Sequence, residues 1–327
     1  MVPADKFYGT YHGHEVSHLR PVVESLRSTG CKRIVWLAGD SSLDNKYWLF
    51  DQHSGADWLQ DNGSCAPALN GYERVLQPPR MVKDVCYWLN KAFSDARPSG
   101  GAAGAGAPIA SCVNTAVEES TLGQRTGSQG QLNPQDQFLR DNIGENDVLI
   151  VDVGGNDIAL QPTVTTAVCM ALLLYLSCTC MIRSLGCAVE VCPGWFFGFP
   201  IGFSHFVYMF RSQTKEYIEK LVSRTRPKRV VVCMLYFLDE TPTGGWADRV
   251  LKLLGYDSNP KKLQAVIRRV FELATSRIVV EGVEVVPCPL FEAMDGRCSA
   301  DYVQRVEPSV QGGQKMAALL APMALEC

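Results

Sequence analysis

The chain has 327 residues, 46% of them hydrophobic, which is enough to bury one large core. Its 31 basic and 34 acidic residues give a net charge of −3, which excludes a strong electrostatic attraction to nucleic acid. No charged linker or long polar tail divides the chain, so we predict one domain spanning residues 1–327.

Five apolar runs predict buried parallel strands, because short continuous runs of branched side chains are typical of strands covered on both faces. They span residues 33–38, 109–114, 147–153, 229–235 and 283–287. Helical patterns lie around and between them, at residues 15–28, 79–94, 205–224, 260–280 and 310–325. The alternation predicts a three-layer α/β/α fold around a parallel sheet of about five strands. In such folds the binding site forms at the carboxyl ends of the strands.

Three segments interrupt this pattern and are predicted to be insertions, at about residues 51–79, 98–108 and 160–210. Residues 158–182 carry no charge and are long enough to span a bilayer. Gln161, Pro162 and several threonines dilute the run, so we favour a buried or lid helix; membrane contact through residues 158–210 stays open but is not favoured. The aromatic, glycine-containing residues 193–210 either cover an acyl-binding pocket or belong to the ordinary core.

Polar motifs follow the first three predicted strands. The first strand ends in Gly39-Asp40-Ser41, where a serine hydroxyl would project from the edge of the sheet near a helix N-terminus. The third strand ends in Gly154-Gly155-Asn156-Asp157, in which the Asn156 amide could donate to an oxyanion. Residues 114–121 follow the second strand, where a backbone N–H could complete an oxyanion hole or Asn114 could cap a helix.

Taken together, these motifs resemble blocks I and III of the SGNH (GDSL-type) hydrolases, with residues 114–121 similar to a degenerate block II. The resemblance spans about residues 33–320 and implies a flavodoxin-like sheet and an esterase or acyl transferase activity without a cofactor. By resemblance, Ser41 is the nucleophile and Asn156 an oxyanion donor. The Glu119 backbone N–H would take the place usually held by glycine, which sets an acid beside the site.

The end of the chain departs from the family pattern, which has Asp-x-x-His before the last helix. Here Glu307 occupies the histidine position and Gln304 the aspartate position; an alternative register puts Asp301 and Gln304 there. No histidine follows His205, so no small shift restores the triad. A carboxylate is a poor base at pH 7 unless burial raises its pKa to about 6–7.

Three hypotheses follow from this departure. Glu307 is the base of an atypical Ser–Glu pair, or His205 or His53 supplies the missing imidazole, or the site binds an acyl or ester ligand without turnover. In the first two cases the substrate is a small-molecule ester, and the apolar residues 164–210 favour an acyl substrate over a sugar ester. The distinguishing feature is whether Glu307 reaches Ser41.

Further residues near the motifs are candidates for substrate contacts. They are Asp40, Asp44, Asn45, Gly155 and Asp157. For Asp44, Asn45 and Lys46 we favour a solvated first helical turn over a substrate contact.

A second motif, His14-Glu15-Val16-Ser17-His18, matches the zinc protease pattern His-Glu-x-x-His. We favour an amphipathic helix instead, because Pro21 follows within one turn and no third ligand lies at a recognisable spacing. No metal site is therefore predicted.

The 13 cysteines are scattered and contain no Cys-x-x-Cys pair, and the first residues lack the apolar segment of a signal peptide. These features predict reduced, mostly buried thiols in a cytoplasmic protein, with Cys178 and Cys180 in a helix interior. The oligomeric state cannot be inferred from this sequence.

Overall fold

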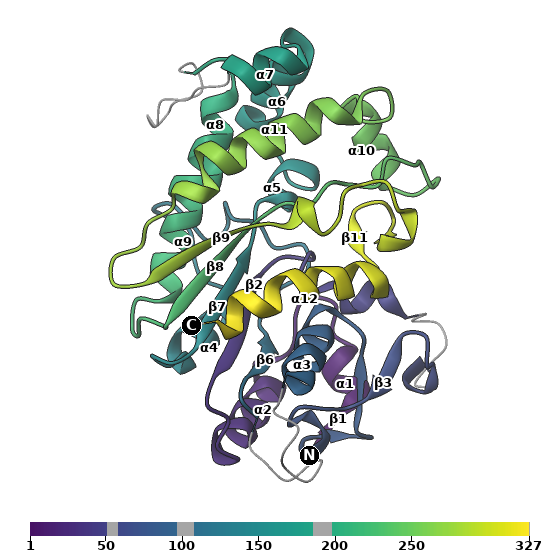
Figure 1. Cartoon of the computed structure of the whole chain (residues 1–327), viewed down its shortest axis with the longest axis vertical. Helices are drawn as coiled ribbons and strands as arrows, with labels where there is room; N and C mark the ends of the chain where they lie inside the picture. The colour runs from purple at the N-terminus through teal and green to yellow at the C-terminus, as the bar shows by residue number, and fades with distance from the viewer. Residues whose placement is uncertain (51–57, 97–107, 186–197, 327) are drawn as a thin grey trace.

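The computed structural model describes residues 1–50, 58–96, 108–185 and 198–326. Its centre is a five-stranded parallel sheet in the order β6-β2-β7-β8-β9 (Figure 1). Along the chain this order reads 2-1-3-4-5, as in flavodoxin-like sheets, so the predicted sheet is confirmed. The strands are β2 (Ile34–Gly39), β6 (Ser111–Asn114), β7 (Val148–Asp152), β8 (Arg229–Met234) and β9 (Glu284–Pro289).

Helices cover both faces of the sheet, because successive strand residues point to opposite faces and both sets are apolar. Val35 and Leu37 of β2 pack with α3 (Val85–Asp95) and α12 (Val310–Leu325). Trp36 of the same strand lies in the core of the opposite face. That face is covered by α2 (Val16–Ser28), α4 (Pro134–Asn142), α9 (Thr214–Leu221) and α11 (Pro260–Leu273). The three-layer prediction is confirmed.

The helix predicted over residues 79–94 begins only at Val85, where the Asp84 carboxylate caps it by accepting from the Tyr87 N–H at 2.7 Å. The residues before it form β5 (Arg80–Val82), which pairs with β3 (Cys65–Pro67). The amino-terminal strand β1 (Val2–Pro3) similarly pairs with β4 (Leu76–Gln77). These short pairings override the helical pattern because they bury Met81 and Val82.

The insertion after β7 folds as α5 (Gly155–Ala159), α6 (Val164–Leu176), α7 (Thr179–Leu185), α8 (Phe203–Val207) and a π-helical turn η4 (Tyr208–Gln213). Figure 1 shows α6 and α7 at one end of the molecule beside α11. No helix in the described part of the chain is long and apolar enough to cross a bilayer. Contrary to the prediction of reduced thiols, Cys178 and Cys180 form a disulfide where α7 begins. Residues 193–197 of the aromatic stretch lie outside the described residues.

The last part of the chain places a small hairpin before α12. It consists of β10 (Tyr302–Val303) and β11 (Glu307–Pro308), paired antiparallel. The remaining short elements are α1 (Ala4–Tyr8), η1 (Asn45–Leu49), η3 (Tyr72–Arg74), α10 (Ala247–Leu253), η5 (Thr275–Arg277), η6 (Leu290–Glu292) and η7 (Ser299–Asp301).

Candidate active site

Ser41 lies in the turn that follows β2, at the carboxyl edge of the sheet. Strand β2 ends at Gly39, where an added Cβ would lie 1.9 Å from the Asp152 carbonyl oxygen, so only glycine fits there. The Asp40 carbonyl then accepts from the N–H groups of Leu43 and Asp44 at 3.1 and 3.0 Å, which closes a tight turn around Ser41. This turn leads into the short 3₁₀ helix η1 instead of the α-helix that the sequence indicated.

Glu307 reaches Ser41 from the hairpin before α12. The Ser41 Oγ donates a hydrogen bond to Glu307 Oε1 at 3.2 Å, and both residues are 5% exposed. Within the described residues Glu307 Oε2 has no hydrogen-bond partner. The arrangement is therefore a Ser–Glu pair without a third residue that orients the acid.

Gln304, at the position that the family fills with aspartate, does not support Glu307. Gln304 and Arg305 adopt positive φ angles of 52° and 70° at the turn of the hairpin. The Gln304 side chain lies against Gly245. Asp301, the acid of the alternative register, instead accepts from Gln311 Nε2 at 2.8 Å and pairs with Lys315.

The environment of Glu307 makes it a stronger base than a solvated glutamate. Burial raises its pKa to about 8, and the negative charge of Asp40 adds to the increase, while the hydrogen bond from Ser41 opposes it. Burial also raises the pKa of Asp40 to about 6. A base acts best when its pKa lies near the working pH, so the Glu307 carboxylate is suited to accept a proton close to neutrality.

Two further buried acids, Glu118 and Asp152, surround the pair. Burial raises the pKa of Glu118 to about 10, with the charge of Glu307 as the next cause. Burial and the charge of Asp40 raise the pKa of Asp152 well above its ordinary range. Glu118 is therefore neutral at pH 7, and burial favours the neutral form of Asp152 as well.

Asn156 lies near Ser41, and Ser120, the residue after Glu119, donates from its hydroxyl to the Gly39 carbonyl oxygen at 3.1 Å. Asn156 is the second residue of α5. Its Nδ2 donates to the Ser120 carbonyl at 3.0 Å, which leaves its second N–H for a ligand. Glu119 has a positive φ of 59°, a conformation that favours the glycine expected by resemblance. Its carboxylate accepts from the Tyr11 hydroxyl at 3.0 Å. The residues after β6 form a loop, so the alternative of a helix capped by Asn114 is wrong.

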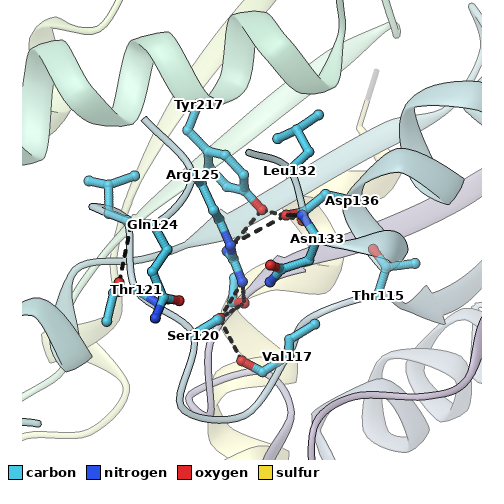
Figure 2. Close-up of polar contacts among 12 residues, drawn as sticks. Thr115, Val117, Ser120, Thr121, Gln124, Arg125, Leu132, Asn133, Asp136 and Tyr217 are labelled. Atoms are coloured by element: carbon cyan, nitrogen blue, oxygen red, sulfur yellow. Dashed lines mark hydrogen bonds and ion pairs between the residues drawn. The ribbon is translucent and has the colours of Figure 1, made fainter. Parts of the chain in front are cut away.

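Arg125, which no motif indicated, ties this loop to the end of β2. Figure 2 shows its fully buried guanidinium between Tyr217 and Asp136 on one side and Ser120 on the other. It donates to the Gly39 carbonyl at 2.9 Å and to the Ser120 hydroxyl, and its Nε lies 3.3 Å from an Asp136 carboxylate oxygen. A single arginine in a polar loop carries no sequence signal for such a role.

Two residues fix the hairpin that carries Glu307. Asn45 Nδ2 donates to the Pro308 carbonyl at 2.8 Å, and its Oδ1 accepts from the Val85 N–H. Arg305 is fully buried and forms ion pairs with Asp248 of α10 at 2.9 Å and with Asp257 at 3.0 Å. Asn45 therefore contacts the protein main chain, whereas the sequence suggested a substrate contact or solvent.

A cavity of about 100 Å³ opens beside Ser41. Its polar end is formed by Asp40, Ser41, Asn156 and Glu307, together with the Gly155 main chain. Its remaining wall is mostly apolar and includes Leu238, Val250, Leu251, Leu254, Leu263 and Ile267. Asp40 and Gly155, two of the residues predicted to contact substrate, thus line the cavity, and its mostly apolar wall could hold an apolar group.

Asp44, Lys46 and Asp157 do not line this cavity. Asp44 and Lys46 form an ion pair at 2.5 Å and are fully buried, so the favoured interpretation of a solvated turn is wrong. Asp44 also accepts from the N–H groups of Gly13 and Glu118, which gives the buried carboxylate enough partners. Asp157 binds the N–H groups of residues 122 and 123 at 2.7 and 2.8 Å and so holds the loop.

The histidines lie in other surroundings. His205 Nε2 hydrogen-bonds the Thr166 hydroxyl at 3.0 Å, and His53 lies outside the described residues. His14 stacks on Phe7, and its Nδ1 lies 2.7 Å from the Phe7 carbonyl oxygen. Because α2 begins at Val16, His14 and His18 do not share a helix face, and no cluster of metal-binding side chains occurs in the described ranges. This geometry does not support the zinc hypothesis.

No protein-family model matches this sequence, and no curated protein matches it either. Similar solved structures include the extracellular lipase from Streptomyces rimosus, with 12% identity, a TM-score of 0.41 and coverage of 89% of this chain and 99% of the lipase. The carbohydrate acetylesterase Est24 from Sinorhizobium meliloti has 13% identity, a TM-score of 0.41 and coverage of 89% and 98%. The lipase/acylhydrolase from Enterococcus faecalis has 12% identity, a TM-score of 0.40 and coverage of 90% and 96%.

Proposed function

We propose that this protein is a serine-dependent ester hydrolase or acyl transferase of the SGNH type, with Ser41 as nucleophile and Glu307 as base. The observation that carries the proposal is the hydrogen bond from Ser41 Oγ to the buried Glu307 carboxylate. It is supported by the opening of the apolar cavity at this pair. We treat the chain as a single catalytic domain.

In the proposed reaction, Ser41 Oγ attacks the ester carbonyl carbon while its proton passes to Glu307. The oxyanion accepts hydrogen bonds from the Asn156 side chain and from the backbone N–H groups of Ser41 and Glu119. Glu307 then protonates the departing alcohol, which leaves an acyl ester on Ser41. Water or another alcohol attacks this ester, transferring its proton to Glu307, and the released Ser41 recovers a proton.

The direct test is labelling of the purified protein with a fluorophosphonate, located by mass spectrometry. We expect a covalent adduct on Ser41 and none in Ser41→Ala. Ser42→Ala is the matched control, because Ser42 lines the same cavity one residue away, and it should keep the adduct on Ser41. An unlabelled wild-type protein, or an adduct that persists in Ser41→Ala, would contradict the proposal.

The rate of labelling should rise with pH. Since the pKa of Glu307 is raised to about 8, the carboxylate that accepts the proton is lost as the pH falls below that value. We expect a decrease of about tenfold per pH unit well below the midpoint and a plateau above it. In Glu307→His the midpoint should fall toward about 6.5, the ordinary pKa of histidine. A rate that is constant between pH 6 and pH 9 would exclude Glu307 as the base.

The same pKa favours a second candidate function, an acyl-binding protein without turnover. At pH 7 a group with a pKa of about 8 is deprotonated in only about a tenth of the molecules, so Ser41 is weakly activated there. The two candidate functions predict different labelling of Ser41 at high pH. Labelling that appears as Glu307 ionises supports the enzyme, and its absence across the whole pH range supports the binding protein.

A further inference from the structure

A second apolar groove lies between α6 and α10, next to the cavity beside Ser41. The groove has a volume of about 300 Å³ and shares four lining residues with the cavity: Ile158, Ala159, Val250 and Leu254. These four residues form a common wall, so the groove lies next to the cavity. A long substituent of a molecule held at Ser41 would reach the groove by passing these side chains.

One face of α6 forms the length of the groove. The lining residues of α6 recur at helical spacing and are Thr166, Ala167, Met170, Ala171, Leu174 and Tyr175, and Pro162 adds to the lining just before the helix. From Thr166 to Tyr175 the helix rises by about 13 Å, at about 1.5 Å per residue. Tyr175 bridges the two helices by donating its hydroxyl to the Leu253 carbonyl at 2.6 Å. The groove thus follows α6 and is bounded by a hydrogen bond near the end of that helix.

The charges along this path restrict what it binds. The charged side chains that line the cavity and groove within the described residues are Asp40 and Glu307, both acidic and both at the Ser41 end. An anionic headgroup or a carboxylate would meet no cation there. Burial of neutral apolar substituents along this path is favourable.

We propose that the groove between α6 and α10 binds the distal part of a long acyl chain, so that the preferred substrates are neutral esters of long-chain fatty acids. This inference rests on the proposed function, since it assumes that the ester carbonyl lies at Ser41. The acyl chain crosses the apolar cavity, passes Ile158 and Val250, and lies along α6. The groove then selects for chain length without touching the reacting atoms.

The test compares para-nitrophenyl butyrate with para-nitrophenyl dodecanoate, using wild type, Ala167→Trp and Val168→Trp. Ala167 lines the groove and is solvent-exposed, so a tryptophan there fills the groove without disturbing the core. Val168, the next residue on the helix, is 44% exposed and does not line the groove. We expect wild type to prefer dodecanoate in kcat/KM by at least about tenfold. Ala167→Trp should remove that preference while leaving butyrate unchanged, and Val168→Trp should behave as wild type.

The outcomes separate this inference from the proposed function. Hydrolysis of butyrate with no preference for dodecanoate, or an equal loss of both activities in Ala167→Trp, overturns the inference while the hydrolase proposal stands. A different outcome is that the enzyme prefers dodecyl acetate to butyl acetate while showing no preference between the two para-nitrophenyl esters. That result would place the alcohol portion of the ester in the groove and would also overturn the inference. If neither ester is cleaved and Ser41 is not labelled, the proposed function itself fails.

Discussion

Replacing Glu307 with glutamine is expected to lower the rate of fluorophosphonate labelling at Ser41 by at least about 100-fold at pH 8, the range that general base catalysis contributes. Glutamine has the same shape and can still accept the hydrogen bond from Ser41 Oγ through its amide oxygen. It cannot take up the proton that leaves Ser41. The change therefore removes the proton acceptor while the hairpin and the hydrogen bond are kept.

The control for this variant is folding, since Glu307 is buried at the pair with Ser41. Glu307→Gln should unfold at the same urea concentration as wild type or a higher one, because a neutral amide replaces an acid that is costly to ionise there. Glu307→His should retain labelling, as imidazole can replace the carboxylate as base. If Glu307→Gln labels as fast as wild type, Glu307 is not the base. If only Glu307→His labels, the serine of the natural protein is not activated and the binding function is favoured.

Replacing Arg125 with methionine is expected to lower the free energy of unfolding by about 3–5 kcal/mol, as is usual when one partner of a buried ion pair is removed. Arg125 and Asp136 are both fully buried, so the remaining carboxylate would keep only its neutral partners. The Gly39 and Ser120 oxygens would also lose their donor. Urea unfolding followed by fluorescence measures the change.

The matched control is Arg140→Met, on the same helix as Asp136. Arg140 pairs with Asp141 at 2.7 Å, but both side chains are partly exposed, at 23% and 37%. Exposed pairs contribute about 1 kcal/mol or less, so this variant should be nearly as stable as wild type. The double variant with Arg125→Met and Asp136→Leu should recover part of the loss, because it leaves no charge unpaired. Equal losses of unfolding free energy for Arg125→Met and Arg140→Met would show that the buried ion pair contributes no more to stability than the exposed pair.

The sequence alone was sufficient for the sheet. Each of the five strands contains a short apolar run, such as Val230–Val232 in β8, and runs of this kind are typical of strands in a covered parallel sheet. The strand ends differ from the prediction by two residues or fewer. The sequence also indicated the location of Ser41 and Asn156, because residues that follow parallel strands meet at one edge of the sheet. The sequence pattern gave a wrong prediction at Arg80–Val82, where it indicated a helix and the chain forms a short strand pair instead.

The site's chemistry was decided by tertiary structure. Ser41 and Glu307 are separated by 266 positions along the chain, and only the hairpin held by Asn45 and Arg305 brings them within 3.2 Å. The raised pKa of Glu307 comes from burial and from the charge of Asp40, both properties of the folded chain. Residue type and spacing determine which groups can reach the edge of the sheet. Whether they touch, and in which protonation state, depends on desolvation and long-range contacts that no local pattern contains.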